Sequence, residues 1–188
     1  MSTPRFFLVA PAEIAAEALL SAATAACAAG DCASLVVGEK TDAATVAKLQ
    51  ALQLAVIIRD CEPRQVHHLK ADGLHISRAA PVKALRGTLK NEVIGVFAAT
   101  SRHIAMEAAE AGADYVAFAQ ASQGAGEPLI AWWQDIFEVP AVAFDPVTPG
   151  SLAALLPQKP DFIRPADEMW ESDVKAREII SGLSKVMA

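Results

Sequence analysis

Short apolar runs alternate with longer amphipathic segments along the chain. The runs are FFLVA, SLVV, LAVII, GLHI, VIGVF, DYVAF, PAVAF and DFIR, at residues 6–10, 34–37, 54–58, 73–76, 93–97, 114–118, 140–144 and 161–164. Runs of this length, rich in β-branched and aromatic residues, are typical of buried strands. The pattern predicts a strand at each of them.

The segments between these runs carry apolar residues at helical spacing. They predict helices at residues 11–29, 41–52, 62–70, 80–86, 100–112, 128–137, 149–156 and 172–186. Pro11 suits the first turn of its helix and Gly30 its end, because proline lacks an N–H and glycine tolerates a helix stop. Thr41 is expected to cap the second helix.

Repeated strand–helix units predict a parallel sheet covered by helices, because parallel neighbours need a crossover that packs on the sheet. Eight such units are enough to close the sheet into a small (βα)8 TIM barrel. The competing fold is a doubly wound open sheet, but no GxGxxG or GxxxxGK[ST] motif supports a nucleotide-binding sheet. The 188 residues fit one domain, residues 1–188.

Composition and charge exclude several classes of protein. With 53% hydrophobic and 20% charged residues the chain is globular and not disordered. A net charge of −6 argues against nucleic acid or a membrane surface as partner. No signal peptide or membrane-spanning segment is evident, so we expect a cytoplasmic protein. The three cysteines form no CxxC pair and are expected to be buried free thiols.

Cationic residues follow several predicted strands. In a barrel of this kind the carboxyl ends of the strands converge on the ligand site. Lys40, Arg59 and Arg78 follow three neighbouring strands, and Arg164 ends the last strand. We expect the first three to face one cavity and to bind an anion such as a phosphate or carboxylate. The alternative is that strand ends are merely solvated and polar.

His75 and Asp60 are further candidates near strand ends. His75 stands between Leu74 and Ile76, where a lone histidine is more often a hydrogen-bonded structural residue than a base. The other histidines fall on predicted helices and give no metal-ligand spacing with His75. Asp60 by itself does not make a cation site.

The order and spacing of several motifs resemble one family. They are EK at 39–40, IIRD ending at Asp60, ADGLHI at 71–76, VIGV at 93–96, EAAEAGADYVAF at 107–118 and PAVAF at 140–144. Together they resemble the thiamine phosphate synthase superfamily of small (βα)8 barrels, which includes the thiazole tautomerase TenI. The resemblance implies a transferase of thiamine biosynthesis that joins hydroxymethylpyrimidine diphosphate to thiazole phosphate with Mg²⁺. It also implies self-association into a homo-oligomer.

The family's site residues carry over only in part. Lys40, Asp60 and His75 are retained from the family's motifs, and we expect them to belong to the ligand site. Asp60 corresponds to one of two magnesium carboxylates, whereas the second position is Ala80. Arg59 replaces an asparagine of the family pattern, and a guanidinium can take over part of a metal's role toward an anion.

Other positions depart further from the family pattern. Asp145 and Pro146 replace a Gly-Gly phosphate turn, and Pro146 has no N–H to offer an oxyanion. The tautomerase histidine falls at Gln120. Three functions stay open. The first is a synthase-type transferase with weakened or altered activity, and the second is a non-catalytic barrel that binds or senses a small anionic, phosphorylated metabolite. The third is a structural or partner-binding relic, which would be favoured if side chains such as Phe97 fill the mouth.

Overall fold

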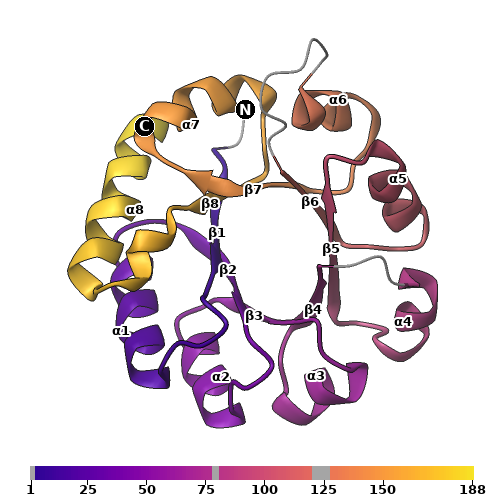
Figure 1. Ribbon diagram of the computed structural model, residues 1–188, viewed down its shortest axis with the longest axis horizontal. Helices are drawn as coiled ribbons and strands as arrows, with labels where there is room; N and C mark the ends of the chain where they lie inside the picture. The colour runs from indigo at the N-terminus through magenta and orange to yellow at the C-terminus, as the bar shows by residue number, and fades with distance from the viewer. Residues whose placement is uncertain (1–2, 78–80, 120–127) are drawn as a thin grey trace.

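The computed structural model describes residues 3–77, 81–119 and 128–188, and in it parallel strands close into a barrel (Figure 1). Each strand pairs with its sequence neighbours, and β1 pairs with β8. The strands are β1 Arg5–Val9, β2 Cys32–Val37, β3 Ala55–Arg59, β4 Gly73–Ile76, β5 Val93–Ala99, β6 Tyr115–Phe118, β7 Ala141–Val147 and β8 Phe162–Pro165. The predicted (βα)8 barrel is confirmed, and the open sheet is not formed.

Helices form an outer ring around the barrel (Figure 1). The α-helices are α1 Ala16–Cys27, α2 Ala43–Gln50, α3 Pro63–Leu69, α4 Val82–Thr88, α5 Arg102–Glu110, α6 Leu129–Ile136, α7 Pro149–Leu155 and α8 Asp173–Met187. Two 3-10 turns, η1 Leu156–Gln158 and η2 Asp167–Trp170, flank β8. In the described ranges no helix is long and apolar enough to cross a bilayer.

Two predicted helix starts are wrong. Helix α1 begins at Ala16 and not at Pro11, because the chain must first pass from the end of β1 to the outer ring. Helix α2 is capped by Asp42 and not by Thr41. The two carboxylate oxygens of Asp42 accept the main-chain N–H and the hydroxyl of Thr45, each at 2.9 Å, which a threonine at position 41 cannot do.

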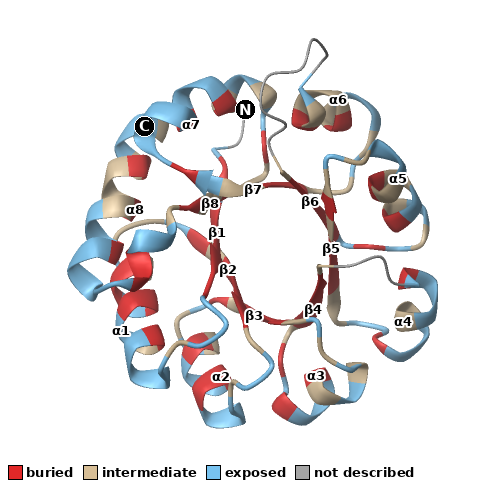
Figure 2. Ribbon diagram, viewed as in Figure 1, coloured by how far each residue is buried: buried red, intermediate tan, exposed pale blue. Residues whose placement is uncertain are grey.

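Buried residues lie in two places, between the sheet and the helices and inside the barrel (Figure 2). The outer layer uses small side chains on α1, where Ala23 and Ala26 are fully buried. Trp133 fills the space under α6 and donates its ring N–H to the Val139 carbonyl at 2.7 Å. The cysteines are free, as predicted, but only Cys32 is buried.

The barrel interior is filled mainly by aromatic side chains. Phe7 lies at the centre, with its ring 5.2 Å from Tyr115 and 6.3 Å from Phe144, in edge-on and tilted contacts. Val36 and Ile57 complete the packing from β2 and β3. Beyond this filling, a hollow opens at the carboxyl ends of the strands.

Three carboxylates fasten the opposite end of the barrel, which we call the amino-end rim. They are Asp72, Asp114 and Asp161, placed just before β4, β6 and β8. Each accepts the main-chain N–H of a residue at the start of the preceding odd-numbered strand. These donors are Val56 at 2.7 Å, Ile94 at 2.7 Å and Ala141 at 2.8 Å. The main-chain N–H of each aspartate in turn donates a hydrogen bond to the carbonyl of its donor residue.

The helices before β3, β5 and β7 support these carboxylates. The supporting donors are Gln50 to Asp72 at 2.9 Å, Gln134 to Asp161 at 2.7 Å, and Arg86 to Asp114. The same arrangement therefore recurs at three strand junctions, β3–β4, β5–β6 and β7–β8. It satisfies N–H groups that would otherwise be buried without an acceptor.

Replacing Asp72 by alanine is expected to lower the free energy of unfolding by about 1–3 kcal/mol, because the Val56 N–H loses its acceptor in a buried position. Urea denaturation measures the effect. Asp135 on α6 is exposed, so Asp135→Ala serves as the matched control and should change stability by less than about 0.5 kcal/mol. Equal effects for the two variants would contradict the fastening role of Asp72.

Gly95 makes room for the Tyr115 ring, since a Cβ atom added at Gly95 would overlap that ring. Gly95→Ala is therefore expected to destabilise the barrel by about 1–3 kcal/mol or more through overpacking. Gly87→Ala on α4 is the control, because a Cβ there meets nothing within 4 Å and alanine favours the helix by roughly 0.5–1 kcal/mol. Thermal unfolding of both variants should show opposite shifts; a tolerated Gly95→Ala would show that Tyr115 can move aside.

Candidate functional site at the barrel mouth

A hollow of about 350 Å³ opens at the carboxyl ends of the strands. Arg59 from β3 and Arg164 from β8 line it, together with Val9 at the end of β1 and residues 10–11 after it. Phe97 and Phe144 also line it, with ring centroids 4.9 Å apart. The volume lies within the range of small-molecule sites, so Phe97 lines the hollow without filling it.

Arg59 is half-buried at the end of β3. Its Nη2 donates to the Ala10 carbonyl at 3.1 Å. Burial lowers the pKa of Arg59 below its ordinary value, and the Arg164 guanidinium lowers it further. Two like charges therefore act on each other across this hollow, and an anion between them would relieve the repulsion.

Arg164 is held in place from three sides. Nη1 donates to the Phe144 carbonyl at 3.2 Å and Nη2 to Asp167 at 2.6 Å. The guanidinium also lies over the Phe144 ring, 5.2 Å from its centroid. Its Nε is buried, with no hydrogen-bond acceptor among the described residues. The side chain is thus pre-positioned, and one donor remains without a partner there.

Asp60 follows Arg59 and stabilises the loop after β3. Its backbone is left-handed, with φ 50°, a conformation that aspartate tolerates better than most residues. Its carboxylate accepts the Ser77 N–H at 2.8 Å, and its own N–H donates to the His75 carbonyl at 2.9 Å. Asp60 thereby ties the ends of β3 and β4 together, and it is absent from the residues that line the hollow.

His75 is fully buried beneath the mouth. Its Nδ1 lies 2.8 Å from the Tyr115 hydroxyl, and its ring stacks on Phe144 at 5.2 Å. Nε2 has no partner among the described residues. Desolvation, helped by the nearby Arg59 charge, lowers the pKa of His75 to about 4. The imidazole is therefore neutral at physiological pH, which supports the structural role favoured from the sequence.

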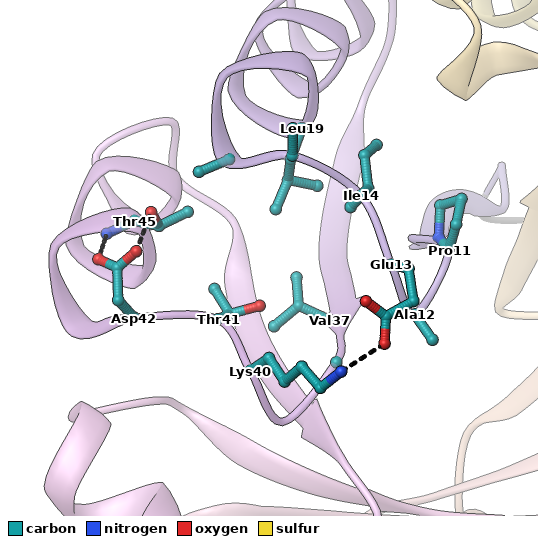
Figure 3. Close-up of a pocket in the computed structure, with 13 residues that line it drawn as sticks. Pro11, Ala12, Glu13, Ile14, Leu19, Val37, Lys40, Thr41, Asp42 and Thr45 are labelled. Carbon is teal, nitrogen blue, oxygen red and sulfur yellow. Dashed lines mark hydrogen bonds and ion pairs between the residues drawn. The ribbon is translucent and has the colours of Figure 1, made fainter.

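Lys40 lies outside the mouth, contrary to the predicted convergence with Arg59. It lines a neighbouring pocket of about 320 Å³ between the loops that follow β1 and β2 (Figure 3). There its Nζ meets Glu13 at 2.6 Å, with both side chains about three-quarters exposed, at 73% and 76%. This hydrogen bond raises the pKa of Lys40. The cause is its place in the loop beyond β2, where strand register no longer directs side chains inward.

Arg78, Ala80 and Gln120 fall outside the described residues, so the predicted part of Arg78 in the cationic cluster stays a prediction. Two contributors were missed from the sequence. Asp167 begins η2, two residues beyond the end of β8, where strand alternation no longer predicts side-chain direction. Tyr115 opens β6 and points inward, as its alternation with Val116 could have shown.

The described residues do not fit Mg²⁺. In residues 3–77, 81–119 and 128–188, no three His, Cys, Asp or Glu side chains gather closely enough to hold a metal ion. One Asp60 oxygen already accepts a main-chain N–H, and the family's second carboxylate position is Ala80. Outside the described ranges, the sequence offers Glu127 as its single acid. Magnesium at phosphate sites is usually held by one or two carboxylates together with waters and substrate phosphates, and at the family positions this chain offers Asp60, already hydrogen-bonded through one oxygen.

The buried His75 should make stability depend on pH. Its folded pKa of about 4 lies below the ordinary value of 6.5, so the unfolded chain binds the proton more readily. The resulting stability is complete above about pH 6.5 and is lost as pH falls toward 4, by roughly 3 kcal/mol at most. The difference in unfolding free energy between wild type and His75→Asn should shrink over that interval. A pH-independent difference would contradict a neutral buried imidazole.

Comparison with known proteins agrees with this architecture. Residues 6–163 match the family model described as thiamine monophosphate synthase. A thiamine-phosphate synthase of Erythrobacter litoralis is 38% identical over 120 residues, which are 57% of this chain and 56% of that protein. One from Rhodospirillum centenum is 29% identical over 205 residues, covering 100% of this chain and 99% of that protein.

Solved structures share the fold at low identity. A thiamine phosphate pyrophosphorylase from Pyrococcus furiosus superposes with a TM-score of 0.78 at 14% identity, over 98% of this chain and 96% of that chain. A structure titled native KDPGal superposes with a TM-score of 0.76, also at 14% identity, over 99% and 95% of the two chains. Similarity at this level shows the barrel alone. The family match over residues 6–163 goes further: this chain belongs to the thiamine monophosphate synthase family.

Proposed function

We propose that the barrel mouth binds a phosphorylated precursor of thiamine and that the chain is a thiamine-phosphate-synthase-type transferase. The observation that carries this proposal is the pair Arg59 and Arg164 facing one hollow of about 350 Å³ in a chain of this family. The ligand would be small and anionic, with phosphate or diphosphate groups held by the guanidiniums.

In the proposed reaction the thiazole nitrogen attacks the methylene carbon of hydroxymethylpyrimidine diphosphate. A C–N bond forms, the C–O bond to diphosphate breaks, and diphosphate leaves with the bonding electrons. Phe97 and Phe144 offer flat apolar surfaces for the rings. Arg59 and Arg164 lie where they would balance the charge on the departing diphosphate.

A second candidate is a non-catalytic barrel that binds or senses the same class of metabolite. Two observations favour it: among the described residues the metal-ligand set is incomplete, and Lys40 is paired with Glu13 in the neighbouring pocket. Such a barrel would bind phosphorylated ligands at the mouth without turnover. The two candidates therefore share a site and differ in chemistry.

Incubation of the pure protein with both precursors and Mg²⁺ is expected to yield thiamine phosphate, measured by liquid chromatography. Arg59→Ala should reduce the rate at least tenfold, because a charge at the leaving group is lost. The exposed Arg177 on α8 provides the control, since Arg177→Ala removes an arginine that does not line the hollow. Ligand binding without product at high enzyme concentration would establish the second candidate instead.

A further inference from the structure

Among the described residues that line the mouth, positively charged side chains outnumber negatively charged ones. Arg59 and Arg164 both line the hollow, whereas Asp167 is the acid that lines it among the described residues. Asp167 is already paired with Arg164 at 2.6 Å. Arg59 donates a hydrogen bond to an uncharged acceptor, the Ala10 carbonyl. A guanidinium in this position has donors left for an external anion.

The surroundings of Asp60 work against a divalent cation. Its carboxylate is tied to the Ser77 N–H at 2.8 Å, and its sequence neighbour is Arg59. By sequence, Arg78 and Ala80 follow Ser77 where a second metal carboxylate would be required. A divalent ion here would face nearby guanidinium charge with few oxygen ligands, which is unfavourable on both counts.

We infer that the barrel mouth recognises phosphate or diphosphate groups directly, through the guanidiniums of Arg59 and Arg164, and does so without a divalent cation. This inference rests on the proposed function only in taking the mouth as the ligand site. Arginine suits the task because its planar fork can bind two phosphate oxygens at once. Arg164 is already oriented by Asp167 and Phe144, so little conformational freedom is lost on binding.

The test is calorimetric titration of the full chain with inorganic pyrophosphate, once with excess EDTA and once with MgCl₂, corrected for the magnesium–pyrophosphate complex. We expect binding in EDTA, with an affinity for free pyrophosphate that Mg²⁺ does not raise. Arg59→Ala should weaken it at least tenfold. Arg59→Lys, which keeps the charge but not the fork, should weaken it less, and Arg177→Ala should leave it unchanged.

Asp60→Asn separates direct recognition from metal-mediated recognition. Asparagine can still accept the Ser77 N–H through its side-chain oxygen, so the loop is preserved while the charge is removed. Direct recognition predicts unchanged or tighter binding in EDTA. Three results would overturn the inference: pyrophosphate binds only when Mg²⁺ is present, it binds in neither buffer, or Asp60→Asn abolishes its binding. If the protein binds pyrophosphate in EDTA but forms no thiamine phosphate, the proposed transferase activity is wrong, whereas the inference of metal-free recognition stands.

Discussion

Filling the inside of a closed parallel barrel is the constraint on which the rest of this structure depends. An eight-stranded barrel of this type has an interior just wide enough for side chains, so its inward positions must be occupied. Here Phe7, Tyr115 and Phe144 occupy much of that space. Gly95 permits this arrangement because it leaves room for the Tyr115 ring. The mouth begins where this aromatic filling ends, toward the carboxyl ends of the strands.

One row of residues connects the filling to the mouth. Arg59, His75, Gly95 and Tyr115 are register partners across β3, β4, β5 and β6. The missing side chain at Gly95 lets the Tyr115 hydroxyl reach His75 across β5. His75 is then buried and neutral, so the cationic charge at this level comes from arginine. A charged imidazole at His75 would be a further positive charge beside Arg59 and Arg164, and it would repel both.

The fold could be predicted from the sequence because strand and helix periods alternate along the chain without interruption. The site could be predicted only where strand alternation fixes side-chain direction. Arg59 follows Ile57 by two positions, and Arg164 follows Phe162 in the same way, so both face inward. Lys40 lies beyond β2, where the loop geometry and Glu13 decide its direction. No local sequence pattern contains that information.

Fixed guanidiniums have a consequence for catalysis that separates binding from turnover. In the proposed reaction Arg164, held by Asp167 and Phe144, would contact the diphosphate both before and after bond cleavage, and its charge is already shared with Asp167. Interactions of equal strength in the ground and transition states improve affinity without speeding the chemical step. A transferase at this mouth therefore needs one contact that strengthens as negative charge builds on the leaving oxygen. Arg59 is the better candidate, because its hydrogen bond to the Ala10 carbonyl can be exchanged for a stronger one to a phosphate oxygen.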